Sequence, residues 1–218
     1  MTSRLDAFYN FLNRPLFPKA RVLLAMAVVP LALALMQPLW RIAMTAPQYP
    51  RGLEMNIYAY KLEGGNDGAD INEINTLNHY IGMHKLDAAA AADLDWIPFA
   101  LGAILLLALR AAVIGNVRHV LDLFVVTGYL SAFAFGRFVY RLWVFGHDLD
   151  PRAPVHVEPF MPVILGHKTV ANFEVYSYPL LGSYLVTAYV LVLVGVLIWH
   201  LHWGRTSTKV LTAQGQHP

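Results

Sequence analysis

The chain has 218 residues, contains no cysteine and carries little charge. Without cysteine it forms no disulfide, no thiolate site for zinc or an iron–sulfur cluster, and no covalent attachment for c-type haem. Charged residues make up 14% of the sequence, against about 25% in a typical soluble domain, whereas apolar residues reach 57%. The formal net charge is +2, and no basic cluster suits nucleic acid. This composition predicts an integral membrane protein that resides in a lipid bilayer.

Four apolar runs approach or exceed the roughly 20 residues that a helix needs to cross a bilayer. We therefore expect an α-helical integral membrane protein with four transmembrane helices, at residues 22–40, 96–114, 120–145 and 178–203. The first run contains two prolines, which predict a kink that neighbouring helices tolerate. It lacks a small-x-small exit, so we expect a permanent span and not a cleaved signal peptide.

The distribution of charge predicts the orientation of these spans. Lys and Arg gather in the tails at 1–21 and 204–218 and around the short turn at 115–119. The two long loops, 41–95 and 146–177, carry twelve of the fourteen carboxylates. The positive-inside rule then predicts cytoplasmic termini in a cell inner membrane, with both loops outside, in the periplasm of a Gram-negative cell.

The first long loop predicts a strand, a turn and a helix. Residues 55–62 alternate in the manner of a half-buried strand, and residues 63–68 form a turn cluster. The D-x-x-E pattern at Asp70 predicts a capped helix start, and Gly82 predicts the helix end. The apolar stripe of this helix consists of Ile71, Ile74, Leu77 and Ile81. A second helical start at Asp87, with the alanines after it, leads into the second span.

The second long loop contains five prolines between residues 151 and 179, which predict extended chain lying over the helices. Residues 164–179 predict one short strand and a re-entry turn, and this strand could pair with the strand at 55–62. We therefore expect a small α+β outer region that is built from both loops.

Histidine and methionine in the outer loops are candidate metal ligands. His79 and Met83 are four residues apart and share a face of the expected helix. Imidazole with thioether suits copper, especially Cu(I), and a third donor would come from His84, Met161 or His167. The alternative is structural, because His79 can cap or pack the loop while Met83 fills an apolar gap.

A second candidate site has oxygen ligands, although its spacing does not match the calcium-loop pattern. Its residues are Asn66, Asp67, Asp70, Asn72 and Glu73. A solvated turn followed by a helix cap is the alternative interpretation.

Three further histidines lie near the expected inner face of the membrane. Paired imidazoles from His119, His200 and His202 could bind a b-type haem. His200 and His202 lie beside Trp199 and Trp203, however, so interfacial histidines within an aromatic belt are the alternative.

Arg137 and Arg141 are four residues apart within the third span, where charge is costly and usually marks function or a partner. Candidate partners are a lipid phosphate, a cofactor carboxylate, a neighbouring subunit, or a carboxylate such as Asp148 or Asp150. The alternative is that the side chains extend to the interface. Asp122 is fifteen residues, or about 22 Å, from Arg137 and is too distant to pair with it.

Residues 73–83, which read EINTLNHYIGM, resemble a segment of small polytopic membrane proteins. These proteins accompany nitrous-oxide-reductase-type maturation factors and cytochrome-oxidase copper chaperones. Residues 159–166, with 171–173 and 177–179, are similar to the same group. The resemblance covers about a fifth of the chain; it implies a copper-enzyme or respiratory setting and favours His79 and Met83.

The sequence has no nucleotide-binding glycine loop, no H-E-x-x-H and no G-x-S-x-G motif, so we expect a non-enzymatic role. The first hypothesis is a copper-handling accessory component of a respiratory or copper-enzyme complex. The second is a structural subunit that caps a partner subunit of a large membrane complex through its outer loops. The third is a small b-type cytochrome.

Overall fold

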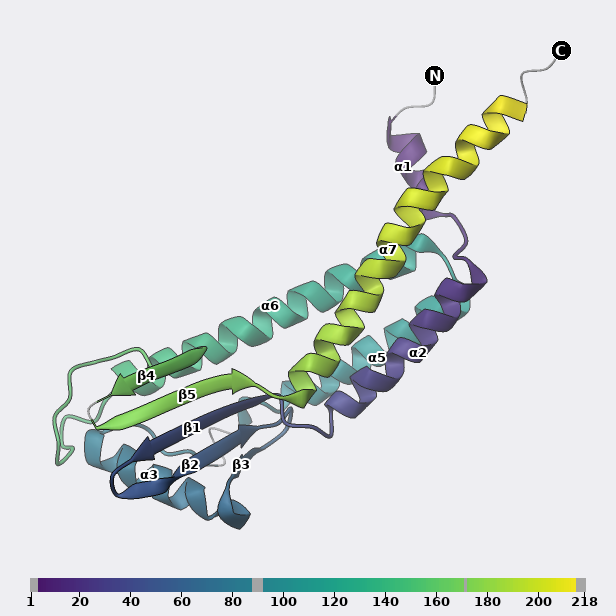
Figure 1. Cartoon of the computed structure of the whole chain (residues 1–218). Helices are drawn as coiled ribbons and strands as arrows, with labels where there is room; N and C mark the ends of the chain where they lie inside the picture. The colour runs from purple at the N-terminus through teal and green to yellow at the C-terminus, as the bar shows by residue number, and fades with distance from the viewer. Residues whose placement is uncertain (1–3, 88–91, 171, 215–218) are drawn as a thin grey trace. The chain divides into compact units, whose positions relative to one another are not determined.

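A computed structural model describes residues 4–87, 92–170 and 172–214 of the chain (Figure 1). The chain divides into two compact units. Unit 1 comprises residues 1–32, 102–129 and 186–218, and unit 2 comprises residues 33–101 and 130–185. The described residues of unit 1 are mainly helical, whereas unit 2 contains the β-sheet.

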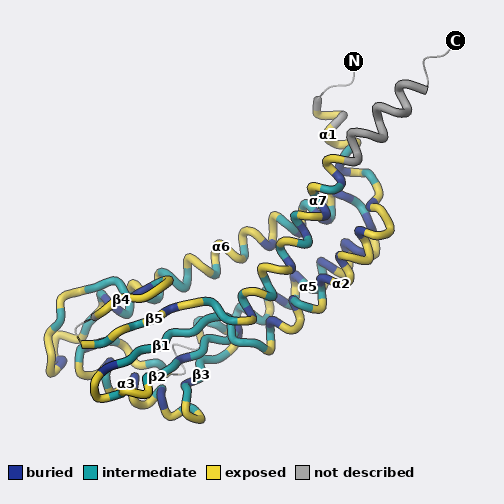
Figure 2. Tube along the Cα trace, in the orientation of Figure 1, coloured by how far each residue is buried: buried dark blue, intermediate teal, exposed yellow. Residues whose placement is uncertain are grey.

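Three helices are long and apolar enough to cross a membrane. They are α5 (Trp96–Ile114), α6 (Val117–His147) and the Leu181–His202 part of α7 (Leu181–Gln214). Less than a third of each span is buried within the chain, so most of its side chains face outward (Figure 2). An apolar surface of this size is costly in water and compatible with lipid. These helices indicate a multi-pass protein in a lipid bilayer.

Helix α2 (Pro18–Ala34) is shorter than the span expected at residues 22–40. It contains 17 residues, which is the lower limit of the usual range of about 17–25. Among the described residues, three helices and not four therefore have the length and composition of a span. Pro38 disfavours helical backbone at the residue before it, and Trp40 begins a β-strand. An apolar run alone does not distinguish the end of a helix from a buried strand.

The other helix boundaries lie near the expected ones. Helix α5 coincides with the expected span at 96–114, and two residues, 115 and 116, separate it from α6, so that the connection is shorter than 115–119. The expected tails are largely helical: α1 (Arg4–Leu12) lies in the first, and α7 continues through the second to Gln214. Residues 215–218, and the alanines at 88–91 that were expected to begin a helix, lie outside the described residues.

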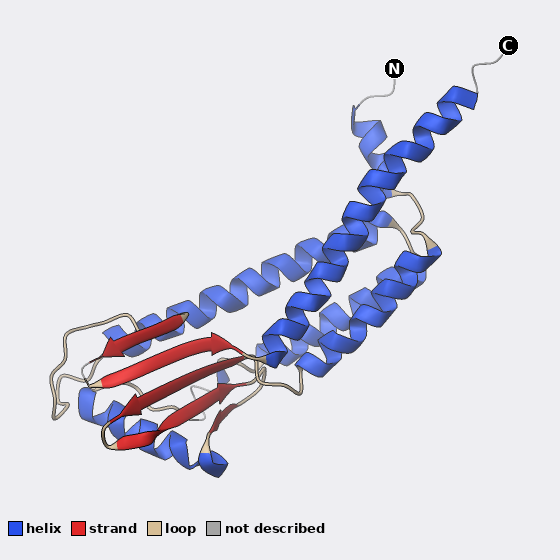
Figure 3. Ribbon diagram, in the orientation of Figure 1, coloured by secondary structure: helices blue, strands red, loops and turns tan. Residues whose placement is uncertain are grey.

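Unit 2 contains a five-stranded antiparallel sheet with the strand order β3-β2-β1-β5-β4 (Figure 3). The first long loop provides β1 (Trp40–Ala46), β2 (Tyr49–Ile57) and β3 (Leu62–Gly64), and the second provides β4 (Gly166–Val170) and β5 (Phe173–Pro179). The expected α+β region built from both loops is therefore confirmed. Its central strand, β1, pairs with β2 from the same loop and with β5 from the second loop.

The strand predictions were wrong in two details. Residues 55–62 do not form one strand, because the Tyr58 N–H donates to the Lys61 carbonyl in a turn between β2 and β3. Residues 164–179 form two strands, and β5 pairs with β1 and not with the strand expected at 55–62. The second error arose because β1 begins within the apolar run that precedes the first loop, so the strand that pairs with β5 was not recognised.

Helix α3 (Ala69–Ile81) covers one face of the sheet with the predicted apolar stripe. Leu53 and Met55 of β2 and Ile74 of α3 are buried at the centre of this contact. The partly buried residues around them are Ile42, Met44, Tyr49, Ile57, Leu62, Ile71, Leu77 and Leu86. Along β1 and β2 these residues recur at every second position, as a strand with one buried face requires.

Asp70 is buried and does not cap α3, contrary to the prediction. The N-cap residue is Gly68, with φ 91° and no side-chain cap. Asp70 Oδ2 accepts the N–H of Glu54 at 2.9 Å, and Oδ1 accepts the amide of Asn66 at 2.7 Å. The carboxylate therefore joins α3 to β2 and to the turn before the helix.

We expect Asp70→Ala to lower the free energy of unfolding by about 1–3 kcal/mol, because it leaves the partly buried N–H of Glu54 without an acceptor. Thermal unfolding of the full chain in detergent measures this effect. Asn72→Ala, on the exposed side of the same helix, is the matched control and should change stability by less than about 0.5 kcal/mol. Equal stability of the two variants would contradict the role given to Asp70.

Candidate functional site

An open pocket of about 490 Å³ lies in unit 2, where the end of α3 meets the second long loop. His79, Met83 and His84 line it from the first loop, and Asp148 and Arg152 are among the residues that line it from the second. The pocket therefore contains three of the five predicted metal ligands, contributed by a short stretch of chain.

Gly82 determines how this stretch leaves the helix. It adopts φ 78°, in the left-handed region that favours glycine. The N–H of Met83 donates to the carbonyl of Asn78 at 2.8 Å, which completes a Schellman-type end of α3. Met83 therefore lies just beyond the helix and not on its face, so the predicted i, i+4 geometry was wrong even though both residues line one pocket.

Two asparagines hold the segment that follows. The side chain of Asn75 accepts the Leu86 N–H at 2.7 Å and donates to the Leu86 carbonyl at 3.2 Å. Asn78, which is buried, donates to the carbonyl of His84 at 3.0 Å. The sequence patterns assigned no role to either asparagine. Their spacing of three residues on one helix was the available signal.

The second loop is bonded directly to the end of α3. The N–H of Asp150 donates to the Gly82 carbonyl at 2.8 Å, and the N–H of Val155 donates to the Tyr80 carbonyl at 2.9 Å. A Cβ at Gly82 would lie 2.8 Å from the carbonyl oxygen of Asp150. Glycine at this position therefore serves both the left-handed turn and the close approach of the second loop.

His84 is oriented by a carboxylate from the second loop. Its Nε2 lies 2.9 Å from Oδ2 of Asp148, and its ring contacts Phe145 edge-on, with ring centroids 5.9 Å apart. An imidazole that donates from Nε2 to a carboxylate presents Nδ1 as a lone-pair donor. This arrangement is typical of histidines that bind metals, although exposed pairs of this kind contribute little stability.

His79 and Met83 remain accessible in different degrees. His79 is exposed, and its ring contacts that of Tyr80 at a centroid distance of 6.4 Å. Within the described part of the chain, no hydrogen bond engages its ring nitrogens. Met83 is partly buried at the pocket wall. A packing or capping role thus accounts for Met83 better than for His79.

Met161 and His167 do not line this pocket. His167 lies on β4 and stacks on Tyr176 of β5, with ring centroids 5.9 Å apart. Strand β4 is at the edge of the sheet, three strands from β2, on which α3 packs. Met161 accepts a hydrogen bond at its carbonyl from Lys168. The second-loop residue that reaches the histidines is Asp148, and no group of three or more His, Cys, Asp or Glu side chains within residues 4–87, 92–170 and 172–214 could hold a metal ion.

Two of the five predicted oxygen ligands, Asp70 and Glu73, use their carboxylates in structural contacts. Both oxygens of Asp70 accept hydrogen bonds from the chain, as described above. Glu73 accepts the hydroxyl of Tyr49 at 2.7 Å, and this bond raises the pKa of that tyrosine. Asn66 and Asp67 have φ of 50° and 56° in a tight turn. These contacts favour the turn interpretation of the set, with Asp70 bridging elements in place of a helix cap.

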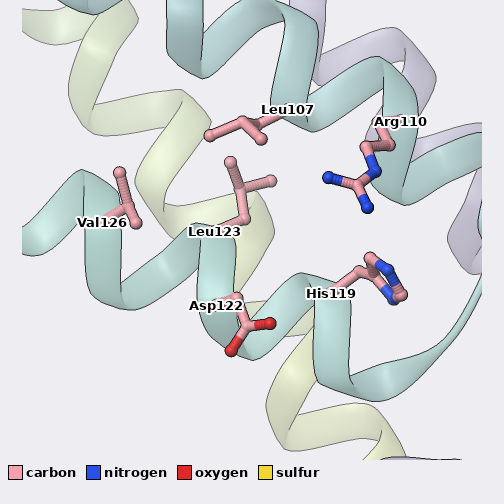
Figure 4. A pocket seen from close by; sticks show the side chains of 6 residues that line it. All are labelled: Leu107, Arg110, His119, Asp122, Leu123 and Val126. Carbon is pink, nitrogen blue, oxygen red and sulfur yellow. The ribbon is translucent and has the colours of Figure 1, made fainter.

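The three histidines considered for haem are in different surroundings within unit 1. His200 is buried; its Nδ1 contacts the Val196 carbonyl at 2.8 Å, and its Nε2 accepts the Phe17 N–H at 3.1 Å. Both ring nitrogens are thereby engaged, so His200 offers no lone pair to an iron. His119 lines a small cavity of about 170 Å³, where it faces the guanidinium of Arg110 (Figure 4). His202 is exposed.

Arg137 and Arg141 are paired with a carboxylate that the sequence did not suggest. Nη2 of Arg137 lies 2.8 Å from Oδ1 of Asp93, and Nε of Arg141 contacts Oδ2 of the same side chain. The candidates named above lie elsewhere, because Asp148 pairs with His84 and Asp150 binds the end of α3. Asp93 precedes α5 and is more than forty residues before Arg137 in the sequence, so only the packing of the chain shows that it lies beside α6.

No family model, curated protein or solved structure matches the chain. The function proposed below therefore rests on the chemistry of these residues.

We expect Asp93→Asn to destabilise the protein, because it leaves the guanidinium groups of Arg137 and Arg141 without their anion. Each arginine side chain is more than a third exposed, so the cost should be about 1–2 kcal/mol, below that of a buried pair. Thermal unfolding in detergent measures it. Asp95→Asn removes an exposed carboxylate two residues away and is the control; equal losses would contradict the pairing.

Proposed function

We propose that this chain is a non-enzymatic, multi-pass membrane protein whose outer loops bind Cu(I) transiently, as an accessory component of a copper-enzyme or respiratory complex. The observation that carries the proposal is that His79, Met83 and His84 line one open pocket. Imidazole and thioether donors suit Cu(I), and the chain has no cysteine to compete with them.

The neighbourhood of His84 supports this assignment. Asp148 fixes the orientation of the imidazole through Nε2 and leaves Nδ1 for a metal. The asparagines that bind residues 84 and 86 through the backbone hold the donor segment in place without using its side chains. His84, held in one orientation, and His79 provide two nitrogen donors, and Met83 provides one sulfur donor.

The openness of the pocket fits transfer better than storage. His79 and His84 are both exposed. A copper ion bound by these histidines can therefore be reached by the ligands of a partner protein. Two or three donors also leave a coordination position for an incoming ligand, whereas a closed cage of four donors retains its metal. The same argument disfavours a permanent redox centre at this position.

Cu(I) binding to the full chain in detergent, measured by competition with a chromophoric chelator, tests the proposal. We expect His79→Ala and His84→Ala to remove most of the binding, and Met83→Leu to weaken it while retaining packing volume. Asp148→Asn should weaken it by about tenfold, because it acts through the orientation of His84.

His167→Ala and Met161→Leu are the matched controls, since they make the same chemical changes outside the pocket. Both should bind Cu(I) as the unchanged protein does. If the pocket variants also bind normally, or if all five histidine and methionine variants weaken binding equally, the pocket is not the copper site.

We further propose that α2 is a fourth span, so that both termini lie in the cytoplasm of a cell with an inner membrane. The N–H of Leu16 donates to the Gly115 carbonyl at 2.6 Å, and that of Val117 donates to the Arg14 carbonyl at 3.1 Å. The start of α2 is thereby bonded to the connection between α5 and α6. A span that begins beside this connection starts on the same side of the membrane as the connection, as the four-span topology requires of α2.

A reporter that is active only in the cytoplasm tests this topology. Fused before Met1 or after Pro218, it should be active, and inserted within residues 64–68 it should be silent, because four crossings return the chain to the side where it began. Activity at only the internal position would reverse the orientation. Activity at one terminus and not at the other would contradict four spans, because three crossings leave the termini on opposite sides.

A further inference from the structure

The arginine pair of α6 lies at the level where a spanning helix leaves the hydrocarbon core. Arg137 is twenty residues beyond Val117, the first residue of α6, and this distance is about 30 Å along the helix axis. The hydrocarbon core of a bilayer is also about 30 Å thick. Arg141 is one turn further along. If the hydrocarbon core begins at Val117, both guanidinium groups lie near the depth of the lipid phosphates.

The cluster formed by Asp93, Arg137 and Arg141 has one positive charge in excess. One carboxylate faces two guanidinium groups, and it engages one nitrogen of each. A guanidinium has five N–H donors in a planar fork that matches phosphate oxygens. Within the described residues, Asp93 is the carboxylate that pairs with each of the two arginines. Both arginine side chains are more than a third exposed.

The surface beside the cluster has the character of a lipid interface. Phe133 and Tyr140 flank Arg137 on the helix, at i−4 and i+3, and both are exposed. Tyr140 stacks on Trp143 with ring centroids 6.3 Å apart. Aromatic side chains of this kind concentrate at the level of lipid headgroups. An anion that reaches the arginines from this side comes from the membrane.

We propose that Arg137 and Arg141 bind the phosphodiester of an anionic phospholipid in the leaflet on the sheet side of the membrane. The phosphate supplies the negative charge that Asp93 leaves uncompensated, and an acyl chain lies along the exposed face that contains Phe133. This site is independent of the proposed copper pocket, because it shares no residue with it.

Native mass spectrometry of the full chain with added phosphatidylglycerol or phosphatidylcholine tests this site. We expect preferential retention of phosphatidylglycerol, and Arg137→Gln should lower that binding by about fivefold, the loss of one cation near a membrane surface. Arg137→Lys should retain much of it. Arg152→Gln, which removes a cation from the outer loop, is the matched control and should leave it unchanged.

Asp93→Asn distinguishes lipid binding from a structural role. The change leaves two uncompensated cations, so it should raise phosphatidylglycerol binding by a similar factor while it lowers thermal stability. Binding that falls in this variant together with stability would overturn the site. So would equal binding of the two lipids, or displacement of phosphatidylglycerol by millimolar inorganic phosphate, which would identify a free anion as the ligand.

Discussion

The pairing of β1 with β5 is the interaction on which the rest of the arrangement depends. It joins two segments separated by more than a hundred residues, and Trp40 strengthens it by donating from Nε1 to the buried hydroxyl of Ser177 at 2.7 Å. Because the two loops form one sheet, they must lie on one side of the membrane. The second loop then passes the end of α3, where Asp150 and Asp148 reach Gly82 and His84.

Several buried polar groups in this protein hold the fold together, whereas some exposed ones are free to bind a ligand. Asp70, Asn78, Ser177 and His200 are buried, and each makes hydrogen bonds that join elements. Leaving such groups unpaired would cost more than the bonds contribute, which is why they are satisfied. The ring nitrogens of His79 and the remaining guanidinium nitrogens of Arg137 and Arg141 differ, since these side chains are exposed or partly exposed. Binding is therefore expected at these exposed groups.

Local patterns predicted the parts of the structure that depend on local physics. The apolar stripe of α3 and its end at Gly82 follow from helical periodicity and from the freedom of glycine at positive φ. Arg137 and Arg141 stood out because charge within a span is costly. The same approach failed at Trp40, where a strand continues an apolar run, and at Asp70, whose partner is on β2. In both cases the deciding contact is with a residue that is distant in the sequence: β5 for Trp40, and Glu54 of β2 for Asp70.

By itself, the sequence determined that the chain belongs in a membrane, where its long apolar helices lie, and which side chains are candidates for binding. Hydrophobicity and periodicity are properties of consecutive residues, so these conclusions needed no contacts. The tertiary structure alone decided that Asp93 faces the two arginines, that Asp148 orients His84, and that His167 lies at the far edge of the sheet. Each of these depends on strand pairing or helix packing between distant segments, for which the chain carries no local signal.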